Sequence, residues 1–341
     1  DARPFVLTRA GYAGVQRFSA VWTGDNVASW EHLQLSIAML TNMSVSGLPF
    51  VGADVGGFAN NASAELYTRW LQAAALTPLY RSHIATGLQE REPWSFGAEH
   101  ERINRAAIEL RYQLLPYIYT LFREHEQTGL PVMRPLWFDY PADYNTYAPS
   151  LPLEQFLLGR DLLVAPVLVQ GATTRPVYFP KGDAWIDWWT GARYEGGTSA
   201  EIDAPLARLP LFARAGAIIP AQAIVQHTGE MSRAPLSVKI VSGADGEGRI
   251  HEDAGDGYGY RLSAWRTTTI KQQGGTIRFK RVGSFDAARA VSFVEILGIN
   301  DKPKEIRIDG REARGASFER DERRLRVPLP EGGVSEITLV P

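Results

Sequence analysis

The stretch Phe18-Ser-Ala-Val-Trp-Thr-Gly-Asp-Asn-Val-Ala-Ser-Trp30 places three kinds of signal next to one another. A short apolar run over residues 18–22 is typical of a buried strand. The tripeptide Gly24-Asp-Asn26 is a turn signal. A helical pattern over residues 29–44 follows, with Leu33, Ile37 and Leu40 on one face. The stretch therefore predicts a strand, a loop and a helix in immediate succession.

The same alternation extends on both sides of this stretch. Compact apolar runs occupy residues 4–8, 48–53 and 77–80, and a second helical pattern covers residues 64–75. A strand–helix–strand–helix rhythm indicates parallel βα units. Four such strands with their helices predict one half of an eightfold (β/α)8 barrel. In these barrels the chemistry lies on the loops that follow the strands' C-terminal ends.

The sequence pattern changes at Pro131, from helical spacing to short runs separated by Pro and Gly. Before it, residues 99–126 predict one long helix kinked at Pro116; its expected inward positions are Ile103, Ala107, Leu110, Leu114 and Ile118. After it, Pro and Gly separate short runs typical of β-sandwiches. We expect strands within residues 161–168, 174–179, 184–189, 209–220, 236–241, 267–272, 276–282 and 290–297, and turns at 243–248 and 251–257.

These patterns give a mixed fold class, α/β followed by all-β. The predicted domains are the C-terminal half of a (β/α)8 barrel (residues 1–128), a proximal β-sandwich (129–221) and a distal β-sandwich (222–341). The cluster of Asp183, Trp185, Asp187, Trp188 and Trp189 could bind sugar, but a sandwich hairpin with buried tryptophans is the favoured interpretation.

Composition excludes several functions. A formal net charge of −2, with no run of Lys and Arg, argues against nucleic acid as a partner. The absence of cysteine removes disulfides and thiolate chemistry. No apolar stretch is long enough to predict a membrane span. The spacing of Glu252, Asp253 and Asp256 does not match an EF-hand, so a solvated turn is favoured over a calcium site.

The opening of the chain is not typical of a signal peptide and lacks an initiator Met. We therefore expect a chain that is cut at its start. The expected protein is soluble, with the bacterial cytoplasm favoured over export.

Asp25 is the sharpest candidate for chemistry. It sits on a strand-to-helix loop between Trp22 and Trp30. Aromatic faces stack on the apolar faces of sugar rings, and apolar surroundings favour the protonated form of a carboxyl group. The alternative is structural, because Gly-Asp-Asn before a helix is also ordinary N-cap chemistry.

Two further polar clusters follow the next apolar runs. Gly52-Ala-Asp-Val-Gly-Gly-Phe58 carries Asp54 among glycines that would let the backbone approach a ligand. Its spacing is not a dinucleotide fingerprint, and a turn with a capping Asp is the alternative. Tyr80-Arg-Ser-His83 carries a lone histidine, which is more often structural than catalytic. Barrel geometry would nevertheless bring all three clusters together.

Taken as a set, these motifs resemble glycoside hydrolase family 31. The resemblance rests on Trp22-Thr-Gly-Asp-Asn26, Gly52–Phe58, Arg81-Ser-His83 and Leu211-Phe-Ala-Arg-Ala-Gly-Ala-Ile-Ile-Pro220, and is only loose beyond about residue 220. It implies a pocket for one terminal α-glucose unit, without a metal or organic cofactor. By resemblance, Asp25 is the acid/base, Arg9, Asp54 and His83 bind the sugar, and Trp22, Phe58 and Arg81 form or support the pocket wall.

One departure from the family pattern concerns the nucleophile, which lies in a Trp-x-Asp-Met-Asn-Glu-type motif on an earlier strand. No Asp-Met pair occurs in this chain. The resemblance therefore implies a partner: an N-terminal half that carries the nucleophile. The function expected is a retaining, exo-acting α-glucosidase that hydrolyses terminal α-glucose from oligosaccharides. The alternatives are an α-xylosidase or α-transglucosidase of the same family, or a non-catalytic carbohydrate-binding subunit.

Overall fold

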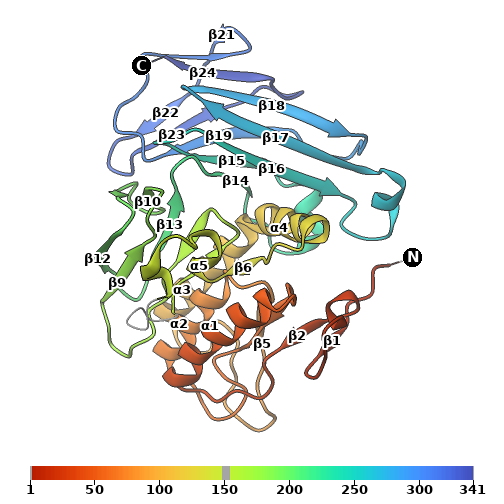
Figure 1. The fold of residues 1–341 in the computed structure, drawn as a ribbon, viewed down its shortest axis with the longest axis vertical. Coiled ribbons are helices and arrows are strands. Elements are labelled where there is room, and N and C mark those ends of the chain that lie inside the picture. Colours follow the sequence, from red (N-terminus) through yellow and green to blue (C-terminus); the bar gives the residue numbers. More distant parts are fainter. Residues whose placement is uncertain (1, 148–153, 341) are drawn as a thin grey trace.

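The computed structural model describes residues 2–147 and 154–340, and its N-terminal part consists of short parallel strands covered by helices (Figure 1). Strands β1 (Leu7–Thr8), β2 (Ala20–Trp22) and β3 (Val51–Gly52) form one parallel sheet. Strands β4 (Asp54–Val55) and β5 (Arg81–Ser82) form a second parallel pair. Only Ala53 separates β3 from β4.

Helices connect these strands as the alternating pattern predicted. Helix α1 (Trp30–Val45) joins β2 to β3 and buries Leu33, Ile37 and Leu40. Helix α2 (Ala64–Ala74) joins β4 to β5. Ser29 is the N-cap of α1, and its hydroxyl accepts the backbone N–H of His32 at 3.2 Å. The interpretation of Asp25 as the helix cap is therefore wrong.

The long helix expected after β5 is two helices. Helix α3 (Ala98–Gln113) ends at Leu114, and α4 (Leu115–Thr128) begins directly after it. Pro116 stands in the first turn of α4, where its missing N–H costs nothing, whereas it would break a continuous hydrogen-bond ladder. The expected inward residues are nevertheless buried, namely Ile103, Ala107, Leu110, Leu114 and Ile118.

The next region is built of antiparallel strands around an aromatic core. A six-stranded sheet has the order β11-β10-β13-β8-β7-β6, and β9 pairs with β12. The bounds are β6 (Met133–Arg134), β7 (Phe156–Leu158), β8 (Leu162–Val164), β9 (Thr174–Phe179), β10 (Trp185–Asp187), β11 (Arg193–Tyr194), β12 (Thr198–Asp203) and β13 (Leu211–Arg214), with the short helices α5 (Leu136–Asp139) and η2 (Tyr144–Tyr147) before β7. Trp185 and Trp188 are buried, in agreement with the hairpin interpretation.

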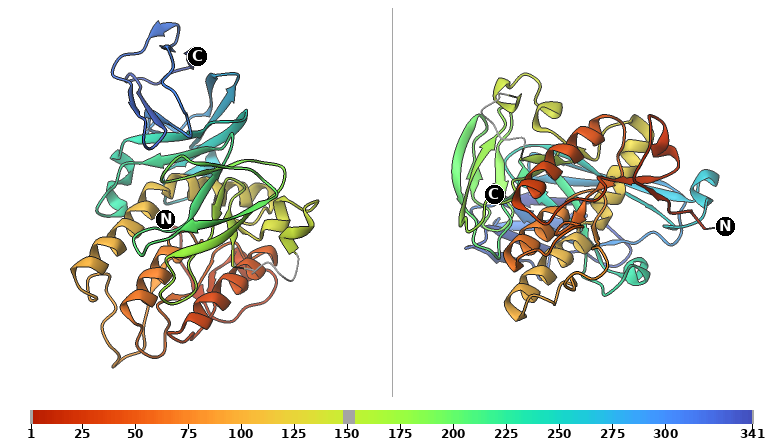
Figure 2. Two further views of the ribbon diagram at one scale, coloured as in Figure 1. Left: turned by 90° about the vertical axis from the view of Figure 1, so that its left-hand side faces the viewer. Right: turned by 90° about the horizontal axis from the view of Figure 1, so that it is seen from below.

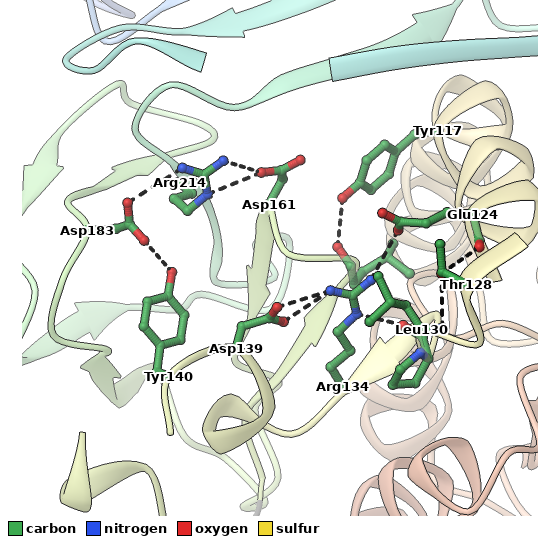
Figure 3. Close-up of polar contacts among 12 residues, drawn as sticks. Tyr117, Glu124, Thr128, Leu130, Arg134, Asp139, Tyr140, Asp161, Asp183 and Arg214 are labelled. Atoms are coloured by element: carbon green, nitrogen blue, oxygen red, sulfur yellow. Dashed lines mark hydrogen bonds and ion pairs between the residues drawn. The ribbon is translucent and has the colours of Figure 1, made fainter. Parts of the chain in front are cut away.

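Two buried arginines form ion pairs in this antiparallel region, and one of them, Arg134, joins it to α4 (Figure 3). Arg134 donates to Asp139 at 3.1 Å and to Glu124 of α4 at 3.1 Å. Arg214 donates to Asp161 at 2.8 Å and lies 3.5 Å from Asp183. Buried charges are tolerated when they are paired in this way.

The last region is a sandwich of a five-stranded and a six-stranded sheet. The sheet orders are β14-β15-β19-β23-β22 and β16-β17-β18-β24-β20-β21. The bounds are β14 (Ile218–Gln222), β15 (Leu236–Val241), β16 (Gly246–Asp253), β17 (Trp265–Gln273), β18 (Thr276–Gly283), β19 (Val291–Leu297), β20 (Glu305–Ile308), β21 (Arg311–Glu312), β22 (Ser317–Glu319), β23 (Arg324–Pro328) and β24 (Glu336–Val340). In the left view of Figure 2 the blue strands of this sandwich lie at the opposite end of the molecule from the red N-terminal helix.

Two details of this sandwich differ from expectation. Strand β14 pairs with β15, so the chain enters the sandwich upstream of residue 222. Strand β16 covers much of the two expected turns and pairs with β17 along its whole length. A polar segment is stable in a strand here because Glu252 accepts hydrogen bonds from the backbone and side chain of Arg289.

Over residues 2–147 and 154–340, no helix combines the length and the apolar character that crossing a bilayer requires.

Candidate active site

The candidate residues collect at one edge of the two parallel strand groups. Arg9 directly follows β1 and Asp25 lies on the loop after β2, while Asp54 and Arg81 begin β4 and β5. Arg9 and Asp25 therefore lie at the carboxyl ends of parallel strands, and the charge of Asp25 is close enough to affect the pKa of Asp54, the first residue of β4.

Asp25 and Arg9 meet across the first two of these loops. The Arg9 Nη1 lies 3.3 Å from the Asp25 Oδ2, and both side chains remain open to solvent, with exposed fractions of 63% and 51%. Gly24 has φ +82°, and a Cβ there would meet the Arg9 Cδ at 3.3 Å. The glycine thus lets the Arg9 side chain lie against the loop that carries Asp25.

Asp54 is the buried member of the site. Its Oδ1 accepts hydrogen bonds from Arg81 Nε at 2.9 Å and Nη2 at 2.5 Å, and its Oδ2 has no partner in the structure. Burial raises the pKa of the Asp54 carboxyl above its ordinary value, although the Arg81 guanidinium opposes the shift. The Arg81 guanidinium also lies over the Trp22 ring, 4.9 Å from its centre.

Phe58 and His83 form a third pair. Their rings are stacked, with centres 5.5 Å apart and planes inclined by 23°. Phe58 is partly buried and His83 is exposed. The stack holds an apolar face and an imidazole side by side at the ends of adjacent loops.

Asn26 fastens the Asp25 loop to the Asp54 loop, a role that the sequence reasoning missed. Its buried Nδ2 donates to the Asp54 carbonyl at 3.1 Å, and its Oδ1 accepts the Phe58 backbone N–H at 2.8 Å. The only signal was its place beside Asp25 in the turn tripeptide, where it was assigned no role of its own.

Gly57 allows the loop after Asp54 to pack closely against the loop after Asp25. A Cβ on Gly57, which has φ +83°, would lie 2.3 Å from the Ala28 backbone nitrogen. At Gly57 the close neighbour is therefore protein backbone, whereas a ligand was expected. Asp54 lies in β4 and not at a helix N-terminus, so the interpretation of it as a turn residue capping a helix is wrong.

A search of the described residues finds no group of three or more His, Asp or Glu side chains that could hold a metal ion. Asp253, once a calcium candidate, instead accepts hydrogen bonds from Arg3 and from the Tyr119 hydroxyl at 2.9 and 2.6 Å.

Carboxylates, arginines and aromatic rings gather at the strand ends of a βα barrel segment, as they do in barrel-type glycoside hydrolases. The chain belongs to glycoside hydrolase family 31. Residues 1–121 match the TIM-barrel domain of this family, and residues 129–219 match its C-terminal domain.

Known proteins are similar to most of this chain. Alpha-glucosidase 2 of Bacillus thermoamyloliquefaciens is 43% identical over 331 residues, which are 95% of this chain and 41% of that protein. A family 31 dextranase of Flavobacterium johnsoniae, solved with isomaltotriose, superimposes with a TM-score of 0.90 at 32% identity over 100% of this chain and 46% of its own. A family 31 α-xylosidase of Xanthomonas citri gives a TM-score of 0.81 at 34% identity over 97% and 37%. The chain thus spans less than half the length of each of them.

Proposed function

We propose that this chain is part of a retaining, exo-acting α-glucosidase that removes terminal α-glucose from oligosaccharides. The observation that carries the proposal is the convergence of Asp25 with Arg9 and of Asp54 with Arg81 on neighbouring strand ends. The 43% identity to an α-glucosidase over nearly the whole chain supports the choice of glucose.

In this proposal Asp25 is the general acid/base. Its half-exposed carboxyl lies where a glycosidic oxygen could reach it. It would donate a proton to the leaving oxygen and then deprotonate the water that releases the sugar. Arg9 would bind a sugar hydroxyl and hold the Asp25 carboxylate after proton transfer.

The other residues would form the sugar pocket. The unpartnered Oδ2 of Asp54 would accept a sugar hydroxyl, since a buried acceptor without a partner is costly. His83 would hydrogen-bond a second hydroxyl. Trp22 and Phe58 would supply apolar surface, and Arg81 would orient Asp54.

The nucleophile in this proposal comes from polypeptide outside these 341 residues. Retention requires a second carboxyl group about 5–5.5 Å from the first. Within the described residues, β1 is paired on one side only, and around it Phe5, Val6, Tyr12 and Phe18 are exposed. An unpaired edge beside apolar side chains suits a further barrel strand.

The test replaces Asp25 in the complete protein. Asp25→Ala should abolish hydrolysis of substrates with poor leaving groups, such as maltose. For α-glucosyl fluoride, whose leaving group needs no proton, it should largely spare kcat/KM, which reports the first step, while kcat falls because the base that activates the water is lost. The control is Asp301→Ala, an 84% exposed aspartate of the distal sandwich, which should leave both rates unchanged. Equal loss of kcat/KM on both substrates would rule out the acid role.

A second candidate is α-xylosidase activity, because the solved α-xylosidase covers 97% of this chain at 34% identity. The two sugars differ by one hydroxymethyl group. Comparing kcat/KM on nitrophenyl α-glucoside and α-xyloside would decide between them, and faster turnover of the xyloside would overturn the glucose assignment.

A further inference from the structure

A cavity of about 280 Å³ lies against α3, apart from the strand-end site. Residues 93–94 and 224–226 line it together with the helix. Its principal lining side chains are Trp94, Glu101, Arg105, Glu109, Tyr112 and Ile224. Ligand pockets for larger molecules are roughly 300–1,000 Å³, so this volume suits one sugar-sized unit.

Trp94 presents an aromatic surface to solvent at the mouth of this cavity. Its exposed fraction is 64%, which is unusual for so large an apolar side chain. The backbone beneath it is anchored, because the fully buried Asn104 donates from Nδ2 to the Pro93 carbonyl at 2.8 Å. Ser95 N–H also donates to the Glu92 carbonyl at 2.9 Å. An exposed indole on an anchored backbone offers contact area at low entropic cost.

The part of the lining that comes from α3 carries both signs of charge. Glu101, Arg105 and Glu109 recur every four residues on one face of α3. Arg105 Nη2 donates to the Glu101 Oε1 at 2.9 Å. Carboxylates accept hydrogen bonds and the guanidinium donates them, which is what a ring of hydroxyls requires. Two carboxylates beside one guanidinium disfavour a phosphate or nucleic acid.

From this combination we propose that the cavity is a second carbohydrate site, which binds a glucose unit of an α-glucan chain. The indole face of Trp94 covers the apolar C–H face of the ring, and the α3 side chains bind its hydroxyls. The choice of α-glucan rests on the proposed function. Trp94 lies on the same loop, residues 83–97, that begins at His83 of the strand-end site. This loop therefore connects the proposed carbohydrate site to the strand-end site along the chain.

The experiment is affinity electrophoresis of the complete protein in gels containing soluble starch or dextran. We expect the wild type to be retarded, and Trp94→Ala to bind about tenfold more weakly, as loss of one aromatic anchor gives. Arg105→Gln, at a 60% exposed side chain, should weaken retention in the same direction. The matched control is Tyr144→Ala, an aromatic residue with 68% exposure outside the cavity.

The outcomes separate this site from the catalytic proposal. Turnover of nitrophenyl α-glucoside should be unchanged in Trp94→Ala, and Asp25→Ala should keep its retention in the gel. Retention without hydrolysis by the wild type would leave the second site standing and overturn the glucosidase. A wild type that is not retarded, or a Trp94→Ala protein that melts at a lower temperature but is retained equally, would overturn the second site.

Discussion

Arg9 and Asp25, sixteen residues apart in sequence, form an ion pair in which Nη1 and Oδ2 lie 3.3 Å apart. Both side chains are more than half exposed, and exposed ion pairs contribute little to stability. The pairing is therefore not explained by what it adds to the fold. Its position at the ends of two neighbouring strands favours a role toward a ligand.

Replacing Arg9 tests that role. Arg9→Leu in the complete protein should lower kcat/KM for nitrophenyl α-glucoside about 10- to 150-fold, because a charged hydrogen bond of roughly 1.5–3 kcal/mol is lost. The melting temperature should hardly change. Arg17→Leu, at another exposed arginine nearby, is the control and should leave kcat/KM intact. An Arg9 variant with normal kinetics would contradict the assignment.

Asn26 should matter for both stability and catalysis. Asn26→Ala removes the two hydrogen bonds that fasten the Asp25 loop to the Asp54 loop and leaves the buried Phe58 N–H with one fewer acceptor. We expect a loss of about 1–3 kcal/mol in the free energy of unfolding. The looser Asp25 loop should lower kcat more than it raises KM. Denaturant unfolding and steady-state kinetics measure the two effects.

The control for Asn26 is Asn42→Ala, at an exposed position of α1. This variant should be neutral in both assays. If Asn26→Ala were destabilised but kept a normal kcat, the hydrogen bonds of Asn26 between the two loops would serve the fold alone.

Local patterns were enough to predict the helices α1 and α2 and the strands β1 to β3, since amphipathic spacing and turn residues act over a few positions. The strand expected at residues 77–80 is wrong, because the pairing begins only at Arg81 in β5, and β4 was expected as a loop. Leu33, Ile37 and Leu40 are buried on α1 as their spacing requires. The break between α3 and α4 depended on where Pro116 fell within a helical turn, which periodicity alone does not reveal. Strand β16 was missed because its polar Glu252 is neutralised by Arg289, a partner far away in sequence.

The candidate site also contains residues that the sequence could predict and contacts that it could not. Asp25, Asp54 and His83 could be found because each follows an apolar run. Their pairing with Arg9, Arg81 and Phe58 depends on strand register, which only the folded chain displays. Asn26 was missed because a buried amide that bonds backbone leaves no distinctive sequence pattern.

Gly57 should be irreplaceable for steric reasons. Gly57→Ala forces a Cβ to within 2.3 Å of the Ala28 nitrogen at a residue with φ +83°. The matched control is Gly87→Ala, where φ is +85° but nothing lies within 4 Å. Gly87→Ala should cost about 1–2 kcal/mol for the left-handed backbone alone. Gly57→Ala should cost about 1–3 kcal/mol more in denaturant unfolding. Equal losses would mean that the loops can separate.

His251 should make the protein less stable in acid. It is buried on β16, stacked against Tyr119 of α4, and burial together with the nearby Arg123 lowers its pKa. The neighbouring Asp253 and Glu126 oppose this shift without cancelling it.

Stability falls with falling pH because the pKa of His251 in the folded protein lies below its value of about 6.5 in the unfolded chain. Unfolded chains bind the proton more readily, so the stabilisation by neutral His251 is complete above about pH 6.5 and is lost as the pH falls through the folded pKa. His251→Gln should therefore show a smaller fall in melting temperature between about pH 7.5 and pH 5 than the wild type. His227→Gln, at an exposed histidine, is the control and should keep the wild-type pH dependence. If the pH dependence of His251→Gln were the same as that of the wild type, protonation of His251 would not be the cause of the loss of stability in acid.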